Sequence, residues 1–144
     1  MRRNGRGVDN SFRPGDLLYR RCVREDIEGD RLLAARIKYD DTSVNWSKYS
    51  KPWDVIFDYP GQGIARWLVR DLPKQIPENY PPGTKVQLHD FTPSHVPLCK
   101  NYLHSEIWVY RSGIRIQRLS SNLAKKQFRT MMSDKSFLLL HPKI

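Results

Sequence analysis

Apolar and polar residues alternate along several stretches of the chain, and the clearest alternation runs from His104 to Tyr110. Its even-numbered positions hold His, Glu, Trp and Tyr, whereas its odd-numbered positions hold Ser, Ile and Val. Because successive side chains of a strand point to opposite faces, this stretch predicts a strand with one polar and one apolar face. The Ser112-Gly113 pair predicts a two-residue turn into a second strand from Ile114, with Val109 opposite Ile116.

Further strands are predicted at residues 16–23, 63–70 and 84–89 and in the C-terminal run SFLLLHP. Within residues 84–89 the alternation predicts that Val86 and Leu88 face inward and that His89 faces outward. Residues 32–37 fit either a strand or a short helix. The proline-rich residues 72–83 predict an irregular loop, because each proline removes a backbone donor and restricts φ.

Two segments predict helices. Ser120 or Ser121 is suited to cap a helix that runs to about Ser133. Its apolar stripe comprises Ala124, Phe128, Met131 and Met132. Ser50 precedes a lysine and a proline, which predicts the start of a shorter helix near residue 53.

These elements predict an α+β fold: a single domain with a mostly antiparallel sheet of about five to six strands, one helix in the C-terminal half and a short helix near residue 53. The 144 residues suffice for one hydrophobic core, and residues 1–12 predict a mobile basic arm. Cys22 and Cys99 follow no zinc or redox spacing and are expected to be free thiols. With no apolar run long enough to span a bilayer, the sequence indicates a soluble cytoplasmic protein without a membrane partner.

The formal net charge is +10, and the positive charge is concentrated at the two ends of the chain. Residues 1–24 hold seven arginines against two aspartates, and residues 111–144 hold eight basic residues against one aspartate. Such ends attract polyanions, so nucleic acid is the partner that this pattern favours. The residues expected to bind phosphates are Arg2, Arg3, Arg6, Arg111, Arg115, Arg118, Lys125, Lys126 and Arg129, and those expected to stack on bases are Trp46 and Trp53. The alternatives are a solvated basic surface without a dedicated partner and a subunit that docks an acidic protein.

His104 and Glu106 share one face of the predicted strand, close enough to exchange a proton or to hold a divalent metal ion. A metal site would need a third ligand, and the nearby candidates, His95 among them, stand at no standard zinc spacing. The pair therefore indicates an acid/base site of a nuclease-like enzyme, with His95 as a further candidate. The other interpretation is that both side chains form hydrogen bonds within a polar sheet face.

A second set of residues is spread along the chain in the order Arg, Ser, Glu. The arginine lies in the stretch LYRR, the serine in TSVNWSKYS and the glutamate is Glu106. This order resembles the triad of the arginine-serine-glutamate class of ADP-ribosyltransferases. The resemblance implies that Arg20 or Arg21 and Ser47 or Ser50 hold NAD, and that Glu106 orients the ribose under attack.

Several motifs are absent from the sequence: a Walker A string, a dinucleotide-binding glycine fingerprint, a cysteine pair of zinc-finger spacing and a nucleophile elbow. Their absence argues against most ATPases, dehydrogenases, classical zinc fingers and α/β-hydrolases. The leading interpretation is a small nucleic-acid-binding protein without a cofactor. The alternative is an enzyme that acts on nucleic acid, a nucleotide or NAD; the oligomeric state is left open.

Overall fold

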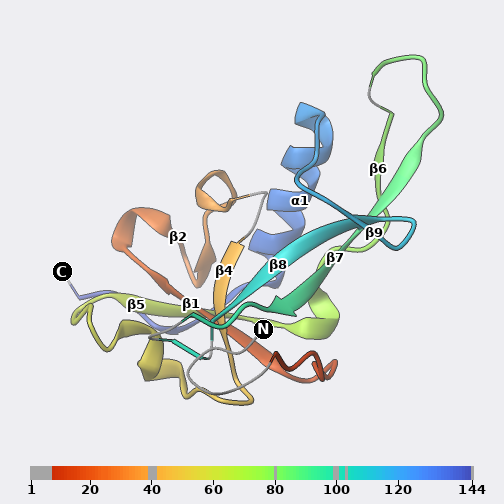
Figure 1. Cartoon of the computed structure of the whole chain (residues 1–144). Coiled ribbons are helices and arrows are strands. Elements are labelled where there is room, and N and C mark those ends of the chain that lie inside the picture. The colour runs from red at the N-terminus through yellow and green to blue at the C-terminus, as the bar shows by residue number, and fades with distance from the viewer. Residues whose placement is uncertain (1–7, 39–41, 80, 99–100, 103, 144) are drawn as a thin grey trace.

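The computed structural model describes residues 8–38, 42–79, 81–98, 101–102 and 104–143. One curled antiparallel sheet, with an α-helix packed on one of its faces, forms the described part of the chain (Figure 1). The sheet comprises β1 (Leu17–Cys22), β4 (Thr42–Trp46), β5 (Gly63–Leu68), β6 (Ile76–Glu78), β7 (Gln87–His95), β8 (His104–Arg111), β9 (Ile114–Ile116) and β10 (Phe137–Leu140). Its order is β10-β5-β1-β4-β8-β7-β6, and β9 pairs with β8.

Short elements complete the fold. β2 (Ile27–Glu28) and β3 (Arg31–Leu32) form a separate two-stranded sheet. The 3-10 helices are η1 (Arg24–Asp26), η2 (Ala34–Arg36), η3 (Pro52–Ile56) and η4 (Val69–Asp71). η3 corresponds to the short helix expected near residue 53, and the ambiguous residues 32–37 divide between the end of β3 and η2.

The α+β class is confirmed, but the expected count of five to six strands is too low, since the main sheet has eight. Two strands were missed. β4 lies in a stretch rich in hydroxyl and aromatic residues, although Thr42, Val44 and Trp46 are buried. β6 contains Pro77, which the sheet tolerates because β6 is its outermost strand.

The β8–β9 hairpin forms as expected, with Val109 opposite Ile116 and Tyr110 opposite Arg115. Ser112 and Gly113 at its turn have φ values of 50° and 78°. Positive φ at both central residues is typical of the type I′ turn, whose twist matches that of the two strands.

The helix α1 (Asn122–Lys135) begins at Ser121, whose side chain accepts a hydrogen bond from the Ala124 amide. Phe128 stacks on Phe91 of β7 with 4.1 Å between ring centroids. The indole of Trp67 donates to the carbonyl of Met132 over 2.8 Å. These contacts join the helix to both halves of the sheet, and Phe91, Phe128, Trp67 and Met132 are part of the hydrophobic core between helix and sheet.

The buried and exposed faces of residues 84–89 are the reverse of those predicted from the sequence. Val86 and Leu88 are 53% and 50% exposed, whereas His89 is fully buried. The end of the β6–β7 hairpin projects from the rest of the molecule (Figure 1). Ile76 of β6 and His89, its partner in the register, are fully buried on one face, so Leu88 lies on the opposite, exposed face. His89 is compensated by hydrogen bonds: its Nδ1 donates to the Ile76 carbonyl over 3.2 Å, and its Nε2 accepts from Arg111 Nε over 3.1 Å.

Part of the N-terminal segment packs on the sheet. Phe12 stacks on Trp46 with 3.8 Å between ring centroids. The Asp9 carboxylate accepts hydrogen bonds from Tyr49 and, over 2.6 Å, from Lys48, and the Asp9 amide donates to His95 Nδ1 over 2.8 Å. Of the residues expected to form a mobile arm, 1–7 lie outside the described residues, and with them Arg2, Arg3 and Arg6.

Candidate functional site

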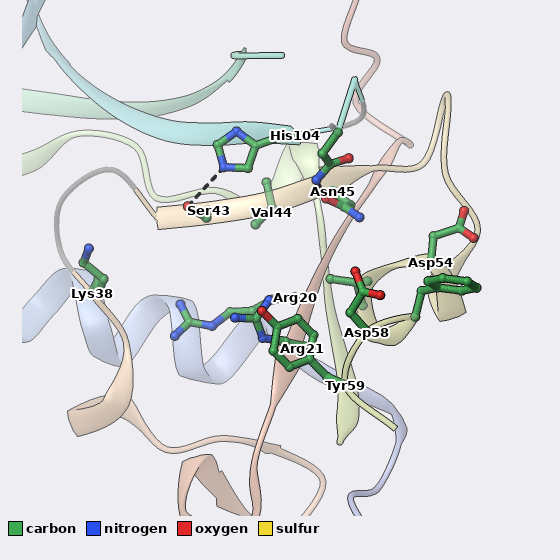
Figure 2. Close-up of a pocket in the computed structure, with 13 residues that line it drawn as sticks. Arg20, Arg21, Lys38, Ser43, Val44, Asn45, Asp54, Asp58, Tyr59 and His104 are labelled. Atoms are coloured by element: carbon green, nitrogen blue, oxygen red, sulfur yellow. Dashed lines mark hydrogen bonds between the residues drawn. The ribbon is translucent and has the colours of Figure 1, made fainter. Parts of the chain in front are cut away.

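Two central strands of the sheet separate along part of their length. β1 pairs with β5 along its whole length, but it pairs with β4 only at Leu18 opposite Trp46 and Tyr19 opposite Asn45. The remaining part of β4 pairs with β8 on its other side. β1 and β4 therefore diverge beyond these two pairs, and a cavity of about 670 Å³ opens between them (Figure 2).

Side chains from several elements line this cavity. β1, β4 and β8 contribute Arg20, Arg21, Ser43, Val44, Asn45 and His104; Lys38, Asp54, Val55, Phe57, Asp58, Tyr59 and Asn101 come from η3 and from the connecting segments. In Figure 2, His104 and Ser43 lie on one side of the opening and Arg20, Arg21 and Tyr59 on the other. The lining therefore combines three cations and two carboxylates with apolar and aromatic side chains.

Arg20 is the most buried of the three cations. Its side chain is partly buried, and this burial lowers its pKa because the charged form loses hydration. Within the described ranges, no hydrogen bond or ion pair of Arg20 is found, and Asp26, the carboxylate that favours its charge, is bound to Arg36 at 2.9 Å. A cation held in this way at the wall of a cavity favours an anionic ligand.

Arg21 is held differently. Its guanidinium carbon lies 3.7 Å from the centroid of the Tyr59 ring. This stacking leaves the edge of the guanidinium able to donate hydrogen bonds, which suits the bidentate recognition of a phosphate.

His104 is hydrogen-bonded through both ring nitrogens. Nδ1 lies 2.8 Å from the Val96 carbonyl, and Nε2 lies 3.2 Å from Ser43 Oγ. A carbonyl oxygen only accepts, so Nδ1 carries a proton, and in the neutral ring Nε2 accepts the hydroxyl proton of Ser43. The arrangement combines a nucleophile, a base and a group that orients the base.

Glu106 lies on the same face of β8 as His104, as expected, because the residues between and beyond them are buried on the opposite face. The two side chains have different partners. Glu106 accepts a hydrogen bond from Trp108 Nε1 over 2.9 Å, and Ser43 of β4 lies opposite Glu106 in the strand register. Glu106 therefore borders the cavity wall at Ser43 without lining the cavity itself.

Four other candidates lie away from the cavity. His95 is 3% exposed, and its Nε2 donates to the Tyr102 carbonyl over 2.6 Å. Ser50 is 8% exposed, and its hydroxyl lies within hydrogen-bond distance of the Lys51 carbonyl and of Asp54. Trp46 is fully buried, so the expectation that it stacks on bases is wrong; Trp53 is 60% exposed.

The basic residues of the C-terminal end have different partners. Arg111 is engaged with buried His89, and Arg129 donates to the Ile37 carbonyl over 3.0 Å. Arg115 lies over the Trp108 ring, 3.4 Å from its centroid, on the face of the hairpin that carries Glu106. Arg118 precedes α1, and Lys125 and Lys126 lie on it.

The structure adds residues that the sequence interpretation missed, namely Lys38, Ser43, Asn45 and Tyr59. A strand assignment for TSVNW would have found Ser43 and Asn45 together, since they are two residues apart and share a face. Nothing in the local sequence joins them to Arg20 or His104.

Among the described residues, no cluster of three His, Cys, Asp or Glu side chains is arranged to hold a metal ion. Cys99 lies outside those residues. The part of the chain that the structure describes also contains no helix with the length and apolar character needed to cross a membrane.

Comparison with known proteins gives no match to a protein-family model, to a curated protein or to a solved structure.

Proposed function

We propose that the protein is an enzyme that binds a nucleotide in the cavity between β1 and β4 and that NAD is its substrate. Arg20 carries the proposal, because a desolvated cation at the cavity wall gains most from an anionic group. Arg21 and Lys38 line the same cavity, whose three cations outnumber the carboxylates of Asp54 and Asp58 by one. Walls that include Tyr59 and Phe57 suit the planar ring of a nucleotide.

The Arg-Ser-Glu order supports NAD in particular. Arg20 lies on β1, Ser43 on β4 and Glu106 on β8, and these three strands are neighbours in the sheet. Ser43 replaces Ser47 and Ser50 in this assignment, because it lines the cavity and lies opposite Glu106. By resemblance to ADP-ribosyltransferases, Arg20 and Ser43 would hold NAD, and Glu106 would orient the ribose.

The chemistry follows from the charges. Breaking the bond between nicotinamide and ribose leaves positive charge on the ribose, which a neighbouring carboxylate stabilises. Glu106 supplies that carboxylate, and its hydrogen bond from Trp108 limits the positions it can take. The leaving group is neutral nicotinamide and needs no acid.

The test is calorimetric titration of the protein with NAD, combined with chromatographic measurement of released nicotinamide. We expect binding and release by the wild type and a loss of at least 10-fold in affinity for Arg20→Gln, since a charge-assisted contact contributes about 1.5–3 kcal/mol. Arg66→Gln is the matched control, because Arg66 lies on β5 with its guanidinium over Phe137. Absence of NAD binding and nicotinamide release, or equal affinities of the two variants, would contradict the proposal.

Nucleic-acid binding is the second candidate, and the net charge of +10 favours it. The exposed Trp53 and the stacked Trp108–Arg115 pair offer aromatic and cationic groups for bases and phosphates. Binding of a labelled oligonucleotide should weaken by at least 10-fold between about 50 and 200 mM salt. Salt-independent affinity would contradict this second candidate. Displacement of the oligonucleotide by an acidic protein at equal charge would instead favour docking of an acidic partner.

A further inference from the structure

We propose that Ser43 is itself an acceptor of the ADP-ribosyl group, with His104 as the base that deprotonates it. The inference rests on the proposed NAD-consuming function and adds a modification site on the enzyme's own cavity wall. Four features support the proposal: the tautomer of His104, the exposure of Ser43, the position of Ser43 beside Glu106, and the hydrogen bond to a histidine that distinguishes Ser43 from the other described serines.

The state of His104 is set by its hydrogen bonds. The Val96 carbonyl, 2.8 Å from Nδ1, keeps the proton on that nitrogen. In the neutral ring, the lone pair of Nε2 therefore faces the hydroxyl of Ser43 at 3.2 Å. An imidazole oriented by a second partner and hydrogen-bonded to a serine is the arrangement that activates a serine as a nucleophile.

Ser43 is also accessible. Its side chain is exposed and lines the cavity that holds Arg20, Arg21 and Lys38. A dinucleotide held there by its phosphates would bring its ribose within range of β4. Glu106, directly across from Ser43 in the register, borders the cavity there, and its carboxylate would turn from Trp108 toward the cavity to stabilise the charge that develops on that ribose.

Other serines on these strands lack this combination. Ser94 of β7 lies opposite Glu106 on the other side of β8, and Ser105 of β8 is fully buried. Ser47 accepts a hydrogen bond from the Leu17 amide over 2.8 Å. Among the residues that the structure describes, Ser43 is the serine whose side chain forms a hydrogen bond with a histidine.

The step balances without a further reactant. Ser43 Oγ attacks C1′ of the ribose that carries nicotinamide, and an O–C1′ bond forms. The C1′–N bond breaks, and its electron pair returns to the pyridinium nitrogen, so neutral nicotinamide leaves. The hydroxyl proton passes to His104 Nε2 and then to solvent. The product is an O-glycoside of serine, which is stable enough to be isolated at neutral pH.

The experiment is to incubate the full chain with NAD, quench, and map ADP-ribosylated peptides by mass spectrometry, with released nicotinamide measured in the same samples. We expect an adduct on Ser43 in the wild type and in Ser94→Ala, and none at that position in Ser43→Ala. His104→Gln should form the Ser43 adduct about 100-fold more slowly, because it lacks the general base. Circular dichroism of each variant establishes that it is folded.

The outcomes separate the inference from the function on which it rests. Nicotinamide release without an adduct on Ser43 would overturn the inference and leave the NAD-consuming activity standing. An adduct that forms equally fast in His104→Gln would also overturn it, since the base would then have no role. If the wild type neither bound NAD nor released nicotinamide, the proposed function itself would be contradicted.

Discussion

The guanidinium of Arg21 lies over the ring of Tyr59, with 3.7 Å between its carbon and the ring centroid. Arg21 belongs to β1, and Tyr59 belongs to the turn that follows η3. The pair thus connects the strand that supplies two cavity cations to the segment that supplies the cavity's aromatic residues. The stacking orients a cation for which no ion pair is found among the described residues, and the charge remains available to a ligand.

We expect Tyr59→Leu to weaken NAD binding by about 2- to 5-fold, because an exposed cation–π contact contributes about 0.5–1 kcal/mol. Tyr59→Phe keeps the ring and should bind like the wild type. Trp53→Leu is the matched control: Lys51 lies 5.5 Å from its ring in the same segment, but Trp53 does not line the cavity. Calorimetric dissociation constants for the three variants check this prediction, which fails if Trp53→Leu has the larger effect.

The docking of residues 8–12 should depend on pH through Asp9. Hydrogen bonds from Lys48, Tyr49 and Ser11 hold the pKa of Asp9 well below its usual range. A carboxyl whose pKa is lowered in the docked state stabilises docking at pH values above its undocked pKa, near 3.9. This contribution is lost as the pH falls below that pKa. Hydrogen exchange of residues 8–12 should therefore become several-fold faster, after correction for intrinsic rates, between about pH 5 and pH 3.

Asp9→Asn should give the same fast exchange at pH 5 and remove the dependence on pH. Asp134→Asn is the control, since Asp134 pairs with Arg31 at 3.2 Å through exposed side chains. Equal protection of residues 8–12 in the wild type and in Asp9→Asn would contradict the prediction.

The thiol of Cys22 should be inert in the folded protein. Cys22 is 1% exposed, and its burial, together with Asp26, raises its pKa to about 11. The thiolate is the reactive form, so its fraction at pH 8 falls about 100-fold relative to an unperturbed thiol. In a Cys99→Ser background, alkylation by iodoacetamide should be at least that much slower than in denaturant. Comparable rates in the two conditions would show that the thiol is not held in the core.

Gly63 is expected to tolerate no side chain. A Cβ at Gly63 would lie 2.6 Å from the Leu140 carbonyl oxygen and 2.7 Å from Pro142 Cδ. Both contacts are with the chain at β10, so Gly63→Ala must displace that strand or strain β5. We expect a loss of about 1–3 kcal/mol in the free energy of unfolding, measured in urea.

Gly15→Ala provides the comparison, because nothing lies within 4 Å of a Cβ at Gly15 and its φ is not positive. That variant should unfold within about 0.5 kcal/mol of the wild type or be slightly more stable. A Gly63→Ala protein as stable as Gly15→Ala would mean that β10 is not packed against β5 as described.

Local pattern was enough for the elements whose partners are close in sequence. The Ser112-Gly113 turn set the register of the β8–β9 hairpin, and the alternation in β8 correctly separated His104 and Glu106 from the buried face. The start of α1 was predicted at Ser120 or Ser121, because a capping hydroxyl binds an amide within the same turn, and Ser121 is the cap. Each of these features depends on contacts between residues only a few positions apart.

Tertiary structure decided the candidate site. The divergence of β1 from β4 places Arg20 and Ser43 on one cavity. The pairing of β4 with β8 makes Ser43 the hydrogen-bond partner of His104, whereas the sequence had paired His104 with Glu106. His89 is buried although its alternation predicted exposure, because Arg111 and a carbonyl satisfy its ring. Alternation along a strand states which residues share a face but not which distant strand lies beside it, and the chemistry of this cavity depends on that pairing.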